Sequence, residues 1–105
     1  MRGHKWQVFQ KRLILSLEYF RVLNRFTANE ITESTGINFY QLQSGVRPVT
    51  IATMVKLEPL FGSAVVSNLF NHAWQGEGEW KEEALTEHIR LEQAKWDKEK
   101  KEHKH

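Results

Sequence analysis

The feature that most constrains this chain is a stretch of about twenty residues, 6–25, with apolar side chains on two adjoining faces of a predicted helix. One set recurs every three or four residues, the spacing of a single helix face: Trp6, Phe9, Leu13, Leu17 and Phe20. A second set repeats at about one helical turn on a neighbouring face: Val8, Leu15, Tyr19, Val22 and Phe26. A helix that is apolar on two sides must be covered on both, by later helices or by a partner subunit. We therefore expect residues 6–25 to form the scaffold of the fold.

Capping residues and glycines divide the next fifty residues into four further helices. The predicted helices span about 28–35, 39–44, 51–61 and 64–73. Each follows a residue able to cap a helix N-terminus, namely Thr27, Asn38, Thr50 and Ser63. Glycines follow the first three: Gly36, Gly45 and Gly62. Glu30 stands three residues after Thr27, which completes a capping box. Ile51, Met54, Val55 and Leu57 recur at helical spacing, and no segment of 1–75 sustains the alternation of a strand, so we predict an all-α fold.

A polar, glycine-bearing link at 76–79 separates this region from a charged C-terminal segment. Residues 80–102 are rich in strong helix formers and Glu-to-Lys pairs. Trp80 and Trp96 on this polar helix fit docking against the helical core or against a second subunit. We expect a helical domain over 1–75, a linker over 76–79, and a charged helix with a frayed tail over 80–105.

Charge is distributed unevenly along the chain. The formal net charge is only +2, but residues 1–25 hold six basic side chains and one acidic one. Residues 26–62 hold two basic and three acidic side chains. The N-terminal excess is compatible either with attraction to phosphates or with an ordinary solvated helix face.

The order of residues from Phe26 onward resembles the Cro/lambda-repressor-like (xenobiotic-response-element type) helix-turn-helix family. The positions that match its pattern are Thr27, Gly36, Ile37, Gly45, Arg47, Pro48, Lys56, Leu57, Leu60 and Gly62. The resemblance implies a compact five-helix DNA-binding domain over 1–75, with its motif at about 27–47 and the charged C-terminal helix as an addition. The chain departs from the pattern between Gly36 and Gly45, which lie about three residues closer than is usual. The recognition helix is therefore expected to be nearly one turn short.

The resemblance places the residues after Gly36 in the major groove of double-stranded DNA. With Phe39 and Leu42 turned inward, the expected base-contacting residues are Asn38, Tyr40, Gln41, Gln43, Ser44 and Arg47. Amide side chains carry the donor and acceptor that adenine requires, and an arginine can reach a guanine or a phosphate. The expected phosphate-contacting residues are Thr27, Asn29, Thr50, Thr53 and Lys56. The alternatives for these side chains are helix capping, solvation and, for Tyr40, packing on the domain.

The sequence offers little for other chemistry. The absence of cysteine excludes disulfides, thiolate metal ligands and cysteine nucleophiles. The five histidines are scattered without a metal-ligand spacing, and no phosphate-binding glycine loop or nucleophile elbow is present. We expect no enzymatic activity, cofactor, metal or small-molecule substrate. Neither a signal peptide nor an apolar run approaching the ~18 residues of a membrane span is evident, which predicts a cytoplasmic protein.

These observations predict a sequence-specific DNA-binding transcriptional regulator, most simply a repressor, that acts as a homodimer on a two-fold site. The compact plan without an effector domain suggests a phage, plasmid or other mobile element. Two alternatives remain. One is a helix-turn-helix protein-interaction module that binds another regulator, and the other is an oligomeric DNA packaging or replication accessory protein.

Overall fold

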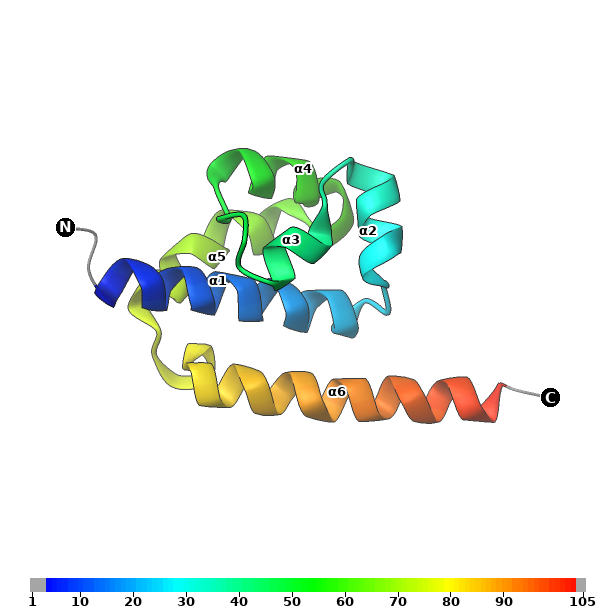
Figure 1. The fold of residues 1–105 in the computed structure, drawn as a ribbon. Coiled ribbons are helices and arrows are strands. Elements are labelled where there is room, and N and C mark those ends of the chain that lie inside the picture. The colour runs from blue at the N-terminus through cyan, green and yellow to red at the C-terminus, as the bar shows by residue number, and fades with distance from the viewer. Residues whose placement is uncertain (1–3, 104–105) are drawn as a thin grey trace.

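Helices account for the secondary structure of the computed structural model, which describes residues 4–103 (Figure 1). The six α-helices are α1 (His4–Leu23), α2 (Ala28–Thr35), α3 (Phe39–Gln43), α4 (Ile51–Phe61), α5 (Ser63–Gln75) and α6 (Glu82–Glu102). A short 3-10 helix, η1 (Gly78–Trp80), lies between α5 and α6. No strand occurs in residues 4–103, so the all-α prediction is confirmed. None of the helices in this part of the chain has the length and apolar character needed to cross a membrane.

Local capping explains where the short helices begin and end. The Thr27 hydroxyl accepts a hydrogen bond from the Glu30 amide at 3.1 Å, and the Glu30 carboxylate accepts one from the Thr27 amide at 2.9 Å. Gly36 follows α2 with φ of 75°, a left-handed conformation that glycine adopts without steric cost. Asn38 caps α3 by accepting from the Gln41 amide. The capping box and these two predicted boundaries are therefore confirmed.

The prediction that Ser63 caps the fifth helix is wrong. Helix α5 begins at Ser63 itself, and its N-cap position is occupied by Gly62, which has φ of 96° and no capping side chain. The physical reason is that α4 ends at Phe61, so one residue joins the two helices. Only a residue with the freedom of glycine reverses the chain in so short a connection.

The main core lies between one face of α1 and the helices α2–α5. The face of α1 that we predicted from residues 6–20 contributes Phe9, Leu13 and Leu17 to this core. The other helices contribute large buried side chains, among them Ile31, Phe39, Leu42, Met54, Leu57 and Leu69. Trp6, in the same predicted set, is 41% exposed and packs at the edge against Phe9.

Helix α6 runs parallel to α1 along the side of the molecule opposite the main core (Figure 1). The residue numbers of contacting pairs rise together: Arg12 with Glu82, Tyr19 with His88, and Arg25 with Glu92 and Glu99. Val22 and Leu85 are buried here, outside the main core. Tyr19 of the second predicted apolar set therefore contacts α6 of the same chain, whereas Phe26 of that set packs against the main core.

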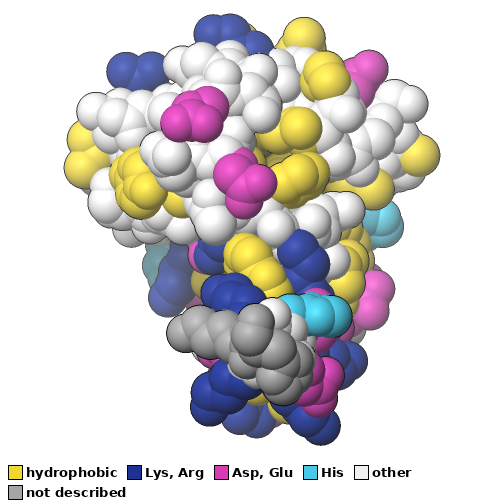
Figure 2. Space-filling model, turned by 90° about the vertical axis from the view of Figure 1, so that its right-hand side faces the viewer, with side chains coloured by type: hydrophobic (Ala, Val, Ile, Leu, Met, Phe, Trp, Pro, Cys, Tyr) yellow, Lys and Arg dark blue, Asp and Glu magenta, His cyan; other side chains and the backbone are white. Residues whose placement is uncertain are grey.

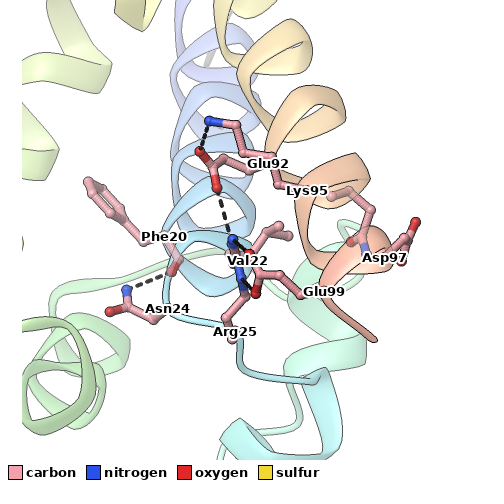
Figure 3. A network of polar contacts seen from close by, with 9 residues as sticks. Phe20, Val22, Asn24, Arg25, Glu92, Lys95, Asp97 and Glu99 are labelled. Carbon is pink, nitrogen blue, oxygen red and sulfur yellow. Dashed lines mark hydrogen bonds and ion pairs between the residues drawn. The ribbon is translucent and has the colours of Figure 1, made fainter. Parts of the chain in front are cut away.

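A charged network joins the end of α1 to α6 (Figure 3). Arg25 donates two hydrogen bonds to the Glu99 carboxylate, at 3.0 and 2.6 Å, and one to Glu92 at 3.1 Å. A further bond to the Val22 carbonyl holds Arg25 against its own helix. Arg25 has φ of 60°, which non-glycine residues rarely adopt. Because its side chain meets two carboxylates and a carbonyl, this network holds the unusual backbone conformation in place.

Arg12 connects three elements at the other end of the α1–α6 pair. Its guanidinium donates to the carbonyls of Ala73 and Trp74 at the C-terminus of α5, and it lies 3.8 Å from the Glu82 carboxylate of α6. A cation at a helix C-terminus is also favoured by the helix dipole. Gly76 lies directly against this guanidinium, and a Cβ there would overlap Arg12 side-chain atoms. The turn into η1 therefore requires glycine for two reasons, because Gly76 also has φ of 61°.

Replacing these glycines by alanine tests that arrangement. Gly36→Ala is the matched control, because Gly36 has a similar φ of 75° but no atom within 4 Å of its Cβ position. We expect Gly36→Ala to lower the free energy of unfolding by about 1–2 kcal/mol through backbone strain alone. Gly76→Ala should cost about 1–3 kcal/mol more, since Arg12 has to move from its carbonyl partners. Urea unfolding monitored by circular dichroism measures both, and equal losses would show that Arg12 moves aside without cost.

The network at Arg25 predicts how stability responds to acid. Hydrogen bonds from Arg25, more than Coulombic attraction, hold the pKa of Glu92 and that of Glu99 below the ordinary value of 4.5. A carboxylate with a lowered folded-state pKa stabilises the fold above its unfolded-state pKa and loses this contribution as the pH falls through the folded-state value. The wild-type melting temperature should therefore fall below about pH 4.5 more steeply than that of Glu92→Gln/Glu99→Gln. Glu102→Gln, at the exposed end of α6, should behave as wild type. Parallel curves for the wild type and the double variant would contradict the role of this network.

Candidate nucleic-acid interface

Helix α3 is only five residues long, and its inward side chains determine which others face outward. Phe39 and Leu42 are each 1% exposed and anchor the helix in the core. Of the residues expected to contact bases, four are exposed: Asn38, Tyr40, Ser44 and Arg47. Gln41 and Gln43 are half-buried. The predicted set is thus divided between outward and inward positions.

Gln43 is turned toward α1. Its amide donates a hydrogen bond of 2.6 Å to the Glu18 carboxylate, which also accepts two hydrogen bonds from Arg21. Arg21 in turn donates to the Phe26 carbonyl. Gln43 follows Phe39 by four residues, so the two share one face of the helix. The sequence contained this signal, because a residue four positions from a buried aromatic faces the core side.

Two other predicted base-contacting residues make local hydrogen bonds. The Asn38 side-chain oxygen accepts from the Gln41 amide at 3.3 Å, and the Ser44 hydroxyl donates to the Gln41 carbonyl at 3.2 Å. Tyr40 is 55% exposed. Within residues 4–103, the side chains of Tyr40, Gln41 and Arg47 make no hydrogen bond, so these three remain available to a ligand.

The residues expected to contact phosphate fall into two groups. Thr27 and Asn29, at α2, are engaged with acidic neighbours: Thr27 with Glu30 in the capping box, and Asn29 with Glu33 at 3.1 Å. The second group lies at the start of α4, where Thr50 and Thr53 form a reciprocal capping box and Lys56 follows one turn later. Each hydroxyl of this pair accepts a hydrogen bond from the other residue's amide. The carboxylates beside α2 make its N-terminus a poorer position for a phosphate than that of α4.

A hollow of about 240 Å³ brings Arg47 and the start of α4 together. Its lining includes Arg47, Thr50, Thr53 and Lys56, together with the turn after α2. No carboxylate lines it, and neither of its two cations forms an ion pair with any of residues 4–103. The amides at the N-terminus of α4 add a partial positive charge. This arrangement suits an anion of the size of a phosphate group.

Four basic side chains of the N-terminal region are directed at the chain's own acids, while Lys5 lies over the Trp74 ring. Lys11 and Arg12 face Glu82, Arg21 pairs with Glu18, and Arg25 pairs with Glu92 and Glu99. A view along α1 and α6 shows lysines and arginines gathered around the α6 end, whereas the surface beyond α1 is mainly uncharged (Figure 2). Four of the six basic side chains that residues 1–25 carry are therefore already engaged with acids of the same chain.

Three apolar side chains of α4 and the loop before it are exposed, and we call them the apolar stripe. It consists of Val46, Ile51 and Val55, which are 75%, 73% and 61% exposed. Ile51 and Val55 are separated by four residues and so share one face of α4, while Met54 and Leu57 fill the core from the other face. Helical spacing alone grouped Ile51 and Val55 with Met54 and Leu57. The packing shows that the first two are exposed and the last two are buried.

Residues 4–103 contain no group of three or more histidine, aspartate or glutamate side chains placed to hold a metal ion. Comparison of the chain with protein-family models, curated proteins and solved structures gives no match. The interface is therefore interpreted from its own geometry.

The two half-buried glutamines of α3 allow a direct test of this geometry. Gln43→Ala should lower the free energy of unfolding by about 0.5–1.5 kcal/mol, because it removes a part-buried hydrogen bond to Glu18. Gln41→Ala, whose side chain has no partner among residues 4–103, should change it by less than about 0.5 kcal/mol. Thermal and urea unfolding of the two variants provide the measurement. Equal effects would show that Gln43 is not anchored to α1.

Proposed function

We propose that this chain binds double-stranded DNA through the surface formed by α3, Arg47 and the start of α4, with α2 and α3 acting as a helix-turn-helix. In this proposal it is a transcriptional regulator, most simply a repressor. The observation that carries the proposal is the hollow in which Arg47 and Lys56 face an anion-sized space without any carboxylate. Arginine binds a phosphate through two parallel N–H groups and lysine through a point charge, so the pair is suited to a DNA backbone.

Base contacts would come from the free side chains next to this hollow. Gln41 offers the paired donor and acceptor that match the major-groove edge of adenine. Tyr40, which precedes Gln41, and Arg47, which follows α3, are both exposed. Because α3 is so short, one copy contacts few base pairs. Two copies on a two-fold site are required for useful specificity, which is the reason for proposing a homodimer.

A second candidate is a protein-interaction module that binds another regulator. The observation that favours it is the apolar stripe of Val46, Ile51 and Val55. Duplex DNA presents phosphates and few apolar groups, so a stripe of this kind is better matched by a protein surface. The two candidates therefore make opposite predictions about salt dependence.

Fluorescence anisotropy measures the affinity of the protein for duplex fragments from around its own gene and for a scrambled duplex, at several salt concentrations. Arg47→Ala and Lys56→Ala should each weaken binding and reduce the slope of log K against log salt by about 0.9, the value for one lost phosphate contact. Gln41→Ala should instead reduce the preference for the specific fragment without changing that slope. Lys98→Ala, an exposed lysine of α6, is the matched control and should leave both quantities unchanged.

Three outcomes would contradict the proposal of a sequence-specific regulator. Equal binding to all fragments would indicate a packaging or accessory role. An unchanged slope in Arg47→Ala and Lys56→Ala would place the DNA elsewhere on the molecule. Absence of binding at low salt would leave the interaction module, for which Ile51→Ser should then weaken capture of the partner regulator.

A further inference from the structure

A second hollow, of about 240 Å³, lies where η1 and the start of α6 fold against the C-terminal half of α1. We propose that it binds a small organic cation carrying a methylated ammonium group. Four rings line the space, those of Tyr19, Phe20, Trp80 and His88, together with Leu85 and the Glu79 carboxylate. It shares no residue with the hollow at Arg47 and Lys56, so this inference does not depend on DNA binding.

The rings are arranged as walls rather than as a closed stack. Tyr19 and Phe20 have centroids 5.8 Å apart and Phe20 and Trp80 6.3 Å apart, with the planes tilted by 36° and 47°. His88 stacks on Tyr19 at 5.5 Å. Leu85, which is 2% exposed, closes the base of the hollow. Because Tyr19, Phe20 and Trp80 are tilted rather than stacked on one another, they do not cover one another's faces.

Trp80 is held in a fixed position. The His72 ring lies parallel to its indole, with centroids 4.7 Å apart and planes only 3° from parallel. His72 does not line the hollow, so it covers one face of Trp80 and leaves the rest of the indole to border the space. A ligand therefore meets a wall that is already positioned, which lowers the entropic cost of binding.

Charge favours a cation over a neutral or anionic ligand. Aromatic faces attract cations through their quadrupole, and sites for quaternary ammonium ions are built from several such rings. Glu79 is exposed and forms no ion pair within residues 4–103. The surrounding segment, 76–83, carries four acidic residues and one basic residue, and one of the acids, Glu82, is paired with Lys11 and Arg12. An anion would thus be repelled, and a neutral molecule would lack the charge attraction that a cation gains from the carboxylate.

The volume limits the size of the ligand. About 240 Å³ is below the roughly 300–1,000 Å³ typical of sites for drug-sized molecules, so the ligand is a small ion such as choline or tetramethylammonium. The walls come from α1, η1 and α6. Binding is therefore linked to the docking of α6 on α1, and a bound cation stabilises the docked arrangement.

The test uses the full chain and NMR signals from the four tryptophan indole N–H groups, assigned by single Trp→Phe replacements. Choline chloride is titrated against sodium chloride at equal ionic strength, and 3,3-dimethyl-1-butanol serves as the uncharged isostere of choline. We expect the Trp80 signal to move and to saturate with a Kd on the order of 1 mM, with little movement of the other three. An equal response to the isostere would overturn the proposal, as would an unmoved Trp80 signal at about 50 mM choline.

Matched variants separate a cation site from simple helix packing. Glu79→Gln should weaken choline binding about fivefold by removing the charge, whereas Glu77→Gln, on the same turn but outside the lining, should not. Tyr19→Phe keeps the ring and should keep binding, while Tyr19→Leu should abolish it. Circular dichroism establishes that each variant is folded. Equal effects of Glu79→Gln and Glu77→Gln, or full binding by a folded Tyr19→Leu variant, would overturn the proposal.

Discussion

The apolar surface on two sides of α1 is the constraint on which the rest of this structure depends. One side is satisfied by the helices that follow it, through Phe9, Leu13 and Leu17. Much of the other side depends on α6, whose Leu85 is buried and whose His88 stacks on Tyr19. Helix α6 therefore has to return along α1, and the turn at Gly76 with the guanidinium of Arg12 directs it there. The hollow between α1, η1 and α6 exists only because of that return.

Docking of α6 and neutralisation of charge occur on one stripe of the helix. Three acids that pair with cations of the α1 region, Glu82, Glu92 and Glu99, share a helix face at spacings of three and four with Leu85, Ile89 and Trp96, and His88 lies beside this face against Tyr19. The apolar members of this stripe bury surface, while the acids meet Lys11, Arg12 and Arg25. The α6 carboxylates thus pair with three of the six basic residues that the N-terminal sequence carries. In the proposed DNA complex, the long-range attraction is left to the few cations around α3 and α4, which makes a second copy more important for affinity.

Local features of this fold were predictable, and long-range ones were not. Capping at Thr27, Asn38 and Thr50 depends on residues within three positions, so the helix starts follow from the sequence alone. The prediction of Ser63 as an N-cap was wrong because the one-residue connection between α4 and α5 places Gly62 at the N-cap position. The exposure of Ile51 and Val55 and the docking of α6 depend on which distant helix lies opposite, and helical spacing does not carry that information. The spacing of Gln43 from Phe39 indicates an inward position, but not that Glu18 is its partner. Among the residues expected to contact DNA, the side chains of Tyr40, Gln41, Arg47 and Lys56 form no hydrogen bond or ion pair within residues 4–103. Gln43 is held by distant Glu18, and the others are held by local hydrogen bonds.

The two candidate functions compete for one helix. Thr53 and Lys56 of α4 face the hollow with Arg47, whereas Ile51 and Val55 lie on the adjacent exposed face. A DNA duplex seated at the hollow would pass next to the apolar stripe and leave it in water, which no DNA contact compensates. A second protein surface on the stripe removes that cost, and it lies close enough to Lys56 to compete with a phosphate. The proposals are reconciled if the partner on the stripe is a second copy of the chain bound to the same duplex, because one apolar contact then orients two sets of Arg47 and Lys56 toward a single site.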